Sequence, residues 1–181
     1  MRWYRGFTLI ELLITIVIGV ILLMVGLPAM RQFIVSSSVE LESSSLYNAI
    51  HSARSQAIAL NQDVVICYAN TSNTCVTTGI NHLLMFVDKD KNGSLNTGNA
   101  DPDIVLLTGG TINSSIVIGT TQSNYRFTQE GVLRSSGILT LYNNDYSCTA
   151  RKIIASLSGK AQLCDNNKAG VGGCPTGSYC P

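Results

Sequence analysis

The chain has 181 residues, which fits an N-terminal segment followed by one globular domain of ordinary size. Twelve basic and eleven acidic residues give a formal net charge of +1, so the overall charge does not indicate a nucleic-acid partner. Only 13% of the residues are charged, while Ser, Thr, Asn and Gly are abundant, which favours a polar, β-rich domain outside the cytoplasm over a cytosolic enzyme.

Residues 1–30 combine a basic start with a long apolar run. Arg2 and Arg5 precede the run, and residues 12–30 carry no charge. The run is too long for an ordinary secretory signal and no good small-residue cleavage site follows it, whereas its length suits a helix that spans a membrane. Neither interpretation accounts for Glu11, because a carboxylate at membrane depth costs about 2.5 kcal/mol or more unless it is paired.

The helical pattern continues beyond the apolar run. Apolar and small residues recur at steps of three and four, which predicts one helix over residues 7–60 whose second half packs against a domain. The predicted packing stripe consists of Val39, Ser43, Leu46, Ile50, Ala53, Ala57 and Leu60.

After Asn61 the pattern changes to short extended runs separated by Gly, Asn and Asp, which is typical of β-strands joined by turns. One long helix followed by hairpins indicates an α+β fold, with the helix packed on antiparallel sheet. The predicted strands are residues 63–69, 83–88, 103–108, 114–119, 124–128, 137–143, 151–157 and 161–164.

Six cysteines point to an oxidising compartment. An even number in an exported chain, with no C-x-x-C pair to suggest zinc, predicts three disulfides, and six cysteines allow about 15 complete pairings. The cysteines are Cys67, Cys75, Cys148, Cys164, Cys174 and Cys180.

The stretch from Asp88 to Gly93 fits the opening of a calcium-binding loop, D-x-D-x-N-G, with Asp88, Asp90 and Asn92 as candidate ligands. The twelfth position of such a loop normally supplies a bidentate Glu, and here it is Asn99. We therefore expect a hairpin turn without a metal, and keep a calcium site as the weaker alternative.

No signature of an enzyme is present. The chain has two histidines and lacks a G-x-S-x-G elbow, a phosphate-binding loop and a paired-histidine metal motif. We therefore expect no catalytic residues and no cofactor.

The segment "GFTLIELLITI", residues 6–16, resembles the class III signal of type IV pilins and type II secretion pseudopilins. In that family a prepilin peptidase removes a short basic leader and N-methylates the new first residue. The resemblance implies cleavage between Gly6 and Phe7 and methylation of Phe7. It also implies that Glu11 of an incoming subunit pairs with the Phe7 amine of a subunit already in the fibre, which offsets the cost of both charges.

Three segments of the domain resemble the GspH/FimT-like branch of the same family. They are "LLMFVDKDKNGSLN", which is similar to the branch's F-x-D-x-x-x-N-G turn, "YRFTQEGVL" with its turn glycine Gly131, and "IIASLSGKAQLC", which is similar to the final hairpin. The resemblance implies a minor pilin that acts in assembly or initiation of a type IV pilus or at its tip. A pseudopilin of the type II secretion system is an alternative.

The branch has a disulfide near the final hairpin, which implies a pair between Cys148 and Cys164. Cys67 and Cys75 bracket a short polar loop, which leaves Cys174 and Cys180 for the tail. The expected segments are a leader (1–6), a transmembrane and fibre-core helix (7–30), its amphipathic continuation (31–61), a β-rich head (62–164) and a disulfide-stapled tail (165–181).

Some members of the branch bind DNA through a basic G-R-x-R turn in the final hairpin. Here the turn reads Gly159-Lys160-Ala161-Gln162, so one basic residue is kept as Lys and the other is absent. Arg151, Lys152 and Lys168 are near Lys160 in the sequence and are candidates to complete a basic patch. DNA uptake is therefore a second alternative function.

The family resemblance also predicts a location and partners. The chain is expected to cross the bacterial inner membrane once, with its head in the periplasm, and then to enter a pilus fibre at the cell surface. Its expected partners are other pilin subunits, the inner-membrane assembly platform, the prepilin peptidase and, in the second alternative, DNA.

Overall fold

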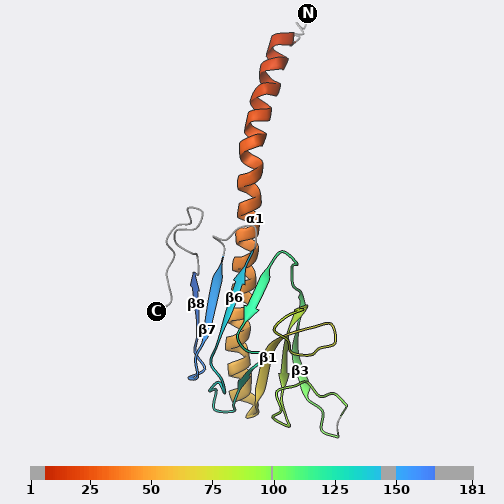
Figure 1. The fold of residues 1–181 in the computed structure, drawn as a ribbon, viewed down its shortest axis with the longest axis vertical. Helices are drawn as coiled ribbons and strands as arrows, with labels where there is room; N and C mark the ends of the chain where they lie inside the picture. The colour runs from red at the N-terminus through yellow and green to blue at the C-terminus, as the bar shows by residue number, and fades with distance from the viewer. Residues whose placement is uncertain (1–6, 99, 144–149, 166–181) are drawn as a thin grey trace, which may run out of the picture.

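The computed structural model of the chain describes residues 7–98, 100–143 and 150–165. One helix, α1 (Leu9–Leu60), begins after the N-cap Thr8 and ends at Asn61, whose left-handed backbone (φ 53°) lets its N–H bond to the carbonyls of Ala57 and Ile58. Its N-terminal half extends away from the head, and its C-terminal half packs on the strands (Figure 1). The predicted single helix is confirmed.

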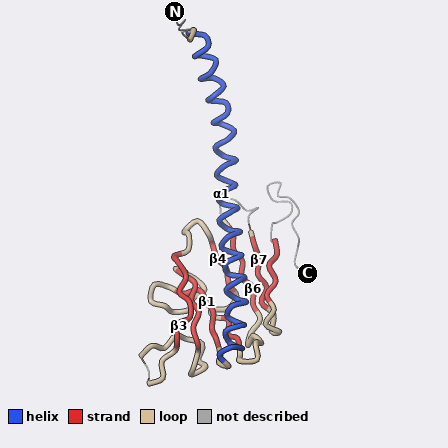
Figure 2. The backbone as a smooth tube through the Cα atoms, turned by 180° about the vertical axis from the view of Figure 1, so that it is seen from behind, coloured by secondary structure: helices blue, strands red, loops and turns tan. Residues whose placement is uncertain are grey.

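All eight predicted strands are present, and they form two antiparallel sheets. Sheet A has the order β3-β2-β1-β5, and sheet B the order β4-β6-β7-β8. Figure 2 shows α1 lying across the strands, with β1 and β3 to one side and β6 and β7 to the other. The predicted α+β fold is therefore confirmed. The strands are β1 (Val64–Ala69), β2 (His82–Val87), β3 (Ile104–Thr111), β4 (Val117–Thr120), β5 (Tyr125–Phe127), β6 (Gly137–Tyr142), β7 (Arg151–Ala155) and β8 (Ala161–Asp165).

The predicted stripe of α1 forms the centre of the main core. Its members Val39, Ser43, Leu46, Ile50, Ala53 and Ala57 are all buried. The prediction is wrong for Leu60, which is 44% exposed. Leu60 is the last helical residue, and the chain turns at Asn61 toward β1, so no strand covers that side chain.

Strands β1 and β2 are buried on both faces, which the alternating pattern of a half-exposed sheet does not predict. One face contacts α1, and the other carries a second, smaller core of Val65, Cys67, Ala69, Leu84 and Phe86. Cys75 and Leu95, from the two loops that flank β2, pack against this smaller core. Loops therefore cover the outer face of sheet A.

Candidate functional site

Within the described part of the chain, the projecting half of α1 is an apolar surface without a partner. Every large apolar side chain described between Phe7 and Ile34 is exposed, from 81% at Leu9 to 44% at Val20. Such a continuous surface in water is typical of a segment that inserts into a lipid or protein environment. Within the described residues, no helical stretch has the length and sustained hydropathy required to cross a bilayer.

Glu11 lies in the first turn of this helix. The hydroxyl of Thr8 accepts the N–H of Glu11 at 3.3 Å, which caps one of the free N–H groups at the helix start. A carboxylate in the first turn is also favoured by the positive end of the helix dipole. Among the described residues, Glu11 has no ion-pair partner. Its carboxylate is therefore accessible to a group from another molecule.

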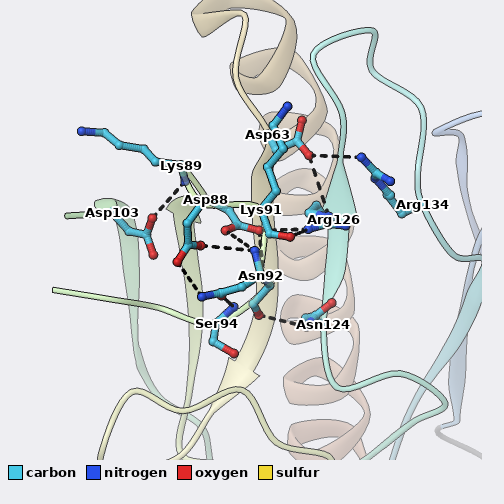
Figure 3. A network of polar contacts seen from close by, with 12 residues as sticks. Asp63, Asp88, Lys89, Lys91, Asn92, Ser94, Asp103, Asn124, Arg126 and Arg134 are labelled. Atoms are coloured by element: carbon cyan, nitrogen blue, oxygen red, sulfur yellow. Dashed lines mark hydrogen bonds and ion pairs between the residues drawn. The ribbon is translucent and has the colours of Figure 1, made fainter. Parts of the chain in front are cut away.

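The second candidate site lies at the distal end of the head, the end remote from the N-terminus, where residues 88–103 connect β2 to β3. Asp88 is buried and organises this loop, because its two carboxylate oxygens accept the N–H groups of Asn92 (3.1 Å) and Gly93 (2.9 Å). Gly93 has a φ of +79°, and its carbonyl accepts the side chain of Asn124 at 2.9 Å (Figure 3). The F-x-D-x-x-x-N-G segment thus forms the predicted turn.

Asp103 fixes the other end of the same loop. It is buried, and its oxygens accept the N–H groups of Lys89 at 2.9 Å and Asn96 at 2.8 Å. Asp88 and Asp103 together accept hydrogen bonds from four backbone N–H groups of the loop. These carboxylates therefore hold the loop in place of backbone hydrogen bonds between paired strands.

Buried carboxylates and arginines meet beside this loop and form what we call the Asp–Arg cluster: Asp63, Asp88, Arg126 and Arg134. Nη1 of Arg126 lies 3.4 Å from Oδ2 of Asp88, and its Nε lies 3.8 Å from Oδ2 of Asp63. The exposed Arg134 is 4.0 Å from the same oxygen of Asp63 (Figure 3). Burial raises the pKa of the Asp88 carboxyl, and the Gly93 N–H and Arg126 oppose that rise only in part.

The sequence interpretation did not identify the Asp–Arg cluster. The available signal was Arg126 between the two aromatic residues of "YRF", since Tyr125 and Phe127 are buried and an arginine between them must project from the other face of the strand. The acidic ends of two neighbouring strands, Asp63 and Asp88, are its natural partners.

The calcium alternative can be tested against this geometry. Carboxylate oxygens of Asp88, Asp90 and Asp103 lie within 4.8 Å of one another, so three acidic groups do converge. Asn92, the third predicted ligand, instead donates its side-chain amide to Asp90 at 2.6 Å, and Asn96 donates to the same oxygen at 2.8 Å. The oxygens are thus already engaged as acceptors. Asn99 lies outside the described residues. Apart from the three converging carboxylates, the described residues give no indication of a bound cation.

One predicted disulfide is present. Cys67 and Cys75 are bonded, with a Cα–Cα separation of 5.6 Å, and the bond holds the β1–β2 loop against the outer face of sheet A. Cys164 is also disulfide-bonded. Cys148, Cys174 and Cys180 lie outside the described residues, so their pairings stay predictions.

The candidate DNA-binding residues are not gathered at one place. Lys160 lies in the β7–β8 turn at the distal end, whereas Arg151 and Lys152 begin β7 at the opposite end of the hairpin. The five residues of β7 span about 13 Å between these ends. Arg151 also contacts Glu40 of α1, with Nη2 and Oε2 3.8 Å apart. Lys168 lies outside the described residues.

An apolar helix that projects from an α+β head, with one carboxylate in its first turn, defines a pilin-type subunit. The family model "Type II transport protein GspH" matches residues 42–159, and the model "Prokaryotic N-terminal methylation motif" matches residues 4–27. The chain therefore belongs to the GspH family. This membership implies assembly with other pilin-type subunits and processing by a prepilin peptidase.

Comparison with solved structures gives matches of low sequence identity. The type IV minor pilin FimU of Pseudomonas aeruginosa (strain PAO1) is 19% identical, with a TM-score of 0.48 over 68% of this chain and 90% of FimU. The minor pseudopilin EpsH from the type 2 secretion system of Vibrio cholerae is 12% identical, with a TM-score of 0.48 over 70% of this chain and 95% of EpsH. Comparison with curated protein sequences gives no match.

Proposed function

We propose that the chain is a minor pilin, a structural subunit that acts in the assembly or initiation of a type IV pilus or at its tip. The observation that carries the proposal is the projecting half of α1, whose described large apolar side chains are all exposed and which has one carboxylate, Glu11, near its start. In a fibre core, the same surface would be covered by the helices of neighbouring subunits.

Cleavage after Gly6 would give the projecting helix a second charge, the amine of Phe7. Two uncompensated charges at membrane depth are each expensive, and pairing the amine of one subunit with Glu11 of the next offsets much of that cost. Glu11 would therefore favour the assembled fibre over the free membrane-bound subunit and fix the register of one helix against the next.

The proposal includes a location. Before assembly, residues 7–30 would anchor the chain once in the inner membrane, with the head in the periplasm, where an oxidising environment suits the bond between Cys67 and Cys75. The partners would then be the prepilin peptidase, the assembly platform and other pilins.

The test is to count surface pili by electron microscopy in a strain that lacks this protein, complemented with the wild type, Glu11→Ala or Glu40→Ala. Glu40 is a matched control, because it is another exposed acid on α1, at the level of the head. We expect the wild type and Glu40→Ala to restore pili. Glu11→Ala should fail to restore them, even though immunoblots should show that this variant is cleaved and stable. Normal piliation with Glu11→Ala would contradict the role of the carboxylate.

A second candidate function is that of a pseudopilin in a type II secretion system. The family description favours it, since it names a type II transport protein. In that case the deletion strain would keep its pili and lose secretion of exported enzymes, and Glu11→Ala would fail to restore secretion. DNA binding receives less support, because only Lys160 of the described candidates lies at the final turn.

A further inference from the structure

One lateral margin of the head ends in an edge strand. Strand β3 is the outer strand of sheet A and, within the described part of the chain, pairs with β2 alone. Figures 1 and 2 show β3 on the opposite side of α1 from β7. The described residues supply no second strand for the outer backbone N–H and C=O groups of β3. Such a row of groups is a template on which a strand of another chain can add.

This edge lacks the devices that normally prevent pairing with another chain. Strand β3 has eight residues, with no charge and no proline among them. Ile104, Val105 and Leu107 are 50%, 43% and 39% exposed. A long, uncharged edge strand with exposed aliphatic side chains is typical of a surface that is covered in an assembly.

A groove of about 440 Å³ lies between this edge and α1. Leu83 and Leu107 contribute aliphatic side chains to its wall on sheet A. Gly110 leaves room in it, since a Cβ atom added there would have nothing within 4 Å. A strand added beside β3 would place every second side chain over this groove. The wall on α1 is small or polar and consists of Ser45, Asn48, Ala49 and Ser52, with Glu42 at the end nearest the projecting half of the helix.

Glu42 gives the groove a negative charge. It is the one ionisable side chain among the lining residues, it is half-buried, and no described residue forms an ion pair with it. Burial raises the pKa of its carboxyl, as expected where a carboxylate loses water and gains no cation. A lysine or arginine brought into the groove by another molecule would compensate this charge.

We propose that the β3 edge and its groove bind an extended segment of a different pilin-type subunit, which adds as a strand beside β3 and places a lysine or arginine near Glu42. The edge backbone recognises an extended chain, Leu83 and Leu107 take its aliphatic side chains, and Glu42 selects a basic residue. Membership of the GspH family already implies assembly with other pilin-type subunits.

The inference rests on the proposed function, because a minor subunit is surrounded mainly by pilins that differ from it. It extends that function by assigning the surface of the head that recognises one such neighbour and the chemistry of the segment that binds there. The contact joins two different chains, so it needs no second copy of this one.

The test is photo-cross-linking of the full chain in the strain that produces it, with p-benzoylphenylalanine at Val105 of β3. Val132, in the loop after β5, is the matched control, because both valines are 43% exposed. We expect ultraviolet light to join Val105 to a different pilin-type subunit, at an apolar segment that contains a lysine or arginine, and Val132 to give no such product. Mass spectrometry of the cross-linked peptides identifies the partner.

Filling the groove provides a second readout. Gly110→Leu puts a side chain where the fold has room for it, so it should lower the yield of the Val105 product about ten-fold through overpacking against the bound segment. Gly119→Leu is the matched control. Gly119 is an exposed glycine in β4, and a Cβ atom there would lie 4.0 Å from the carbonyl oxygen of Thr140, an ordinary contact. This variant should leave the yield unchanged.

Neutralising the acid provides a third readout. Glu42→Gln should lower the yield about five-fold, the scale of a solvent-accessible ion pair. Glu40→Gln removes an exposed acid from the same helix outside the groove and should not lower it. Calorimetry checks that each variant remains folded.

The outcomes that overturn the docking surface are specific. They are a Val105 product with a second copy of this chain, with residues 166–181 of the same chain or with a protein of another class, no product at all, or a yield unaffected by Gly110→Leu and Glu42→Gln. Counting pili in the same strains keeps the two proposals apart. If only the wild type and Glu40→Ala restore pili while Val105 gives no product, the docking surface fails and the proposed function stands. If the deletion strain keeps its pili, the proposed function fails, and the identity of the subunit joined to Val105 still decides the docking surface.

Discussion

Arg126 reaches from β5 to the loop after β2, where its Nη1 lies 3.4 Å from Oδ2 of the buried Asp88. The same side chain contacts Asp63, which is 3% exposed and has one carboxylate oxygen without a hydrogen-bond donor. One guanidinium therefore compensates two buried carboxylates at the ends of neighbouring strands. This contact ties β5 to the loop that connects β2 and β3.

Removal of Arg126 should therefore be costly. Arg126→Gln leaves two buried carboxylates with less compensation, and we expect it to lower the free energy of unfolding by about 3 kcal/mol. Arg134→Gln is the matched control, because Arg134 is 53% exposed and 4.0 Å from Asp63, and it should cost less than about 1 kcal/mol. Urea denaturation of the full chain in detergent measures both. Equal losses would show that Arg126 has no special role.

The bond between Cys67 and Cys75 should stabilise the head measurably. It closes a loop with a sequence separation of 8, for which chain entropy predicts about 2.5 kcal/mol. The double variant Cys67→Ala, Cys75→Ala should lose about that amount and lower the melting temperature measured by calorimetry. A melting temperature unchanged by the double variant would mean that packing of the loops, including Leu95, on the outer face of sheet A is sufficient without the bond.

Much of this fold could be predicted because the relevant signals are local. The three- and four-residue steps of the α1 stripe, and the turn residues between short apolar runs, each report the conformation of their own segment. The family resemblance placed Gly93, Gly131 and Gly159 at turns, and all three have positive φ. The bonded pair Cys67 and Cys75 was predictable because a short loop brings its ends together.

The features that were missed depend on tertiary contacts. Leu60 fits the helical stripe by spacing, but its burial depends on where the sheet lies. The grouping of Asp63, Asp88 and Arg126 joins residues up to 63 positions apart, and no local pattern encodes that contact. Likewise, Lys160 and Lys152 are close in the sequence, yet the antiparallel hairpin places them at opposite ends.

Gly159 should not tolerate a side chain. Its φ is +75°, and a Cβ atom there would lie 2.1 Å from the carbonyl oxygen of Gly131. A side chain at Gly159 would cause both backbone strain and a steric clash, and Gly79 separates these two effects. Its φ is +68°, but a Cβ atom added there would have nothing within 4 Å. We expect Gly79→Ala to cost about 1 kcal/mol from backbone strain alone. Gly159→Ala should cost at least about 2 kcal/mol more, because the two turns must separate. Thermal unfolding compares the two, and similar losses would contradict the close contact.

The groove between α1 and β3, lined in part by Glu42, gives a prediction on pH. Glu42 is half-buried there, and burial raises the pKa of its carboxyl. A carboxyl group with a higher pKa in the folded chain favours folding most when it is protonated. That contribution is complete below the unfolded-state pKa of about 4.3 and is lost as the pH rises through the folded-state value. Ionised Glu42 therefore destabilises the isolated head at neutral pH.

Glu42→Gln keeps the shape of the side chain and removes its titration. We expect the variant to have a higher melting temperature than the wild type at pH 7, and the difference to disappear as the pH falls below about 4. Glu40→Gln, two residues earlier in α1, controls for loss of an acid from the same helix, because the Glu40 side chain is 62% exposed. Differential scanning calorimetry at several pH values makes the comparison. A difference between Glu42→Gln and the wild type that stays constant across this range would show that the gain comes from packing, independent of the charge.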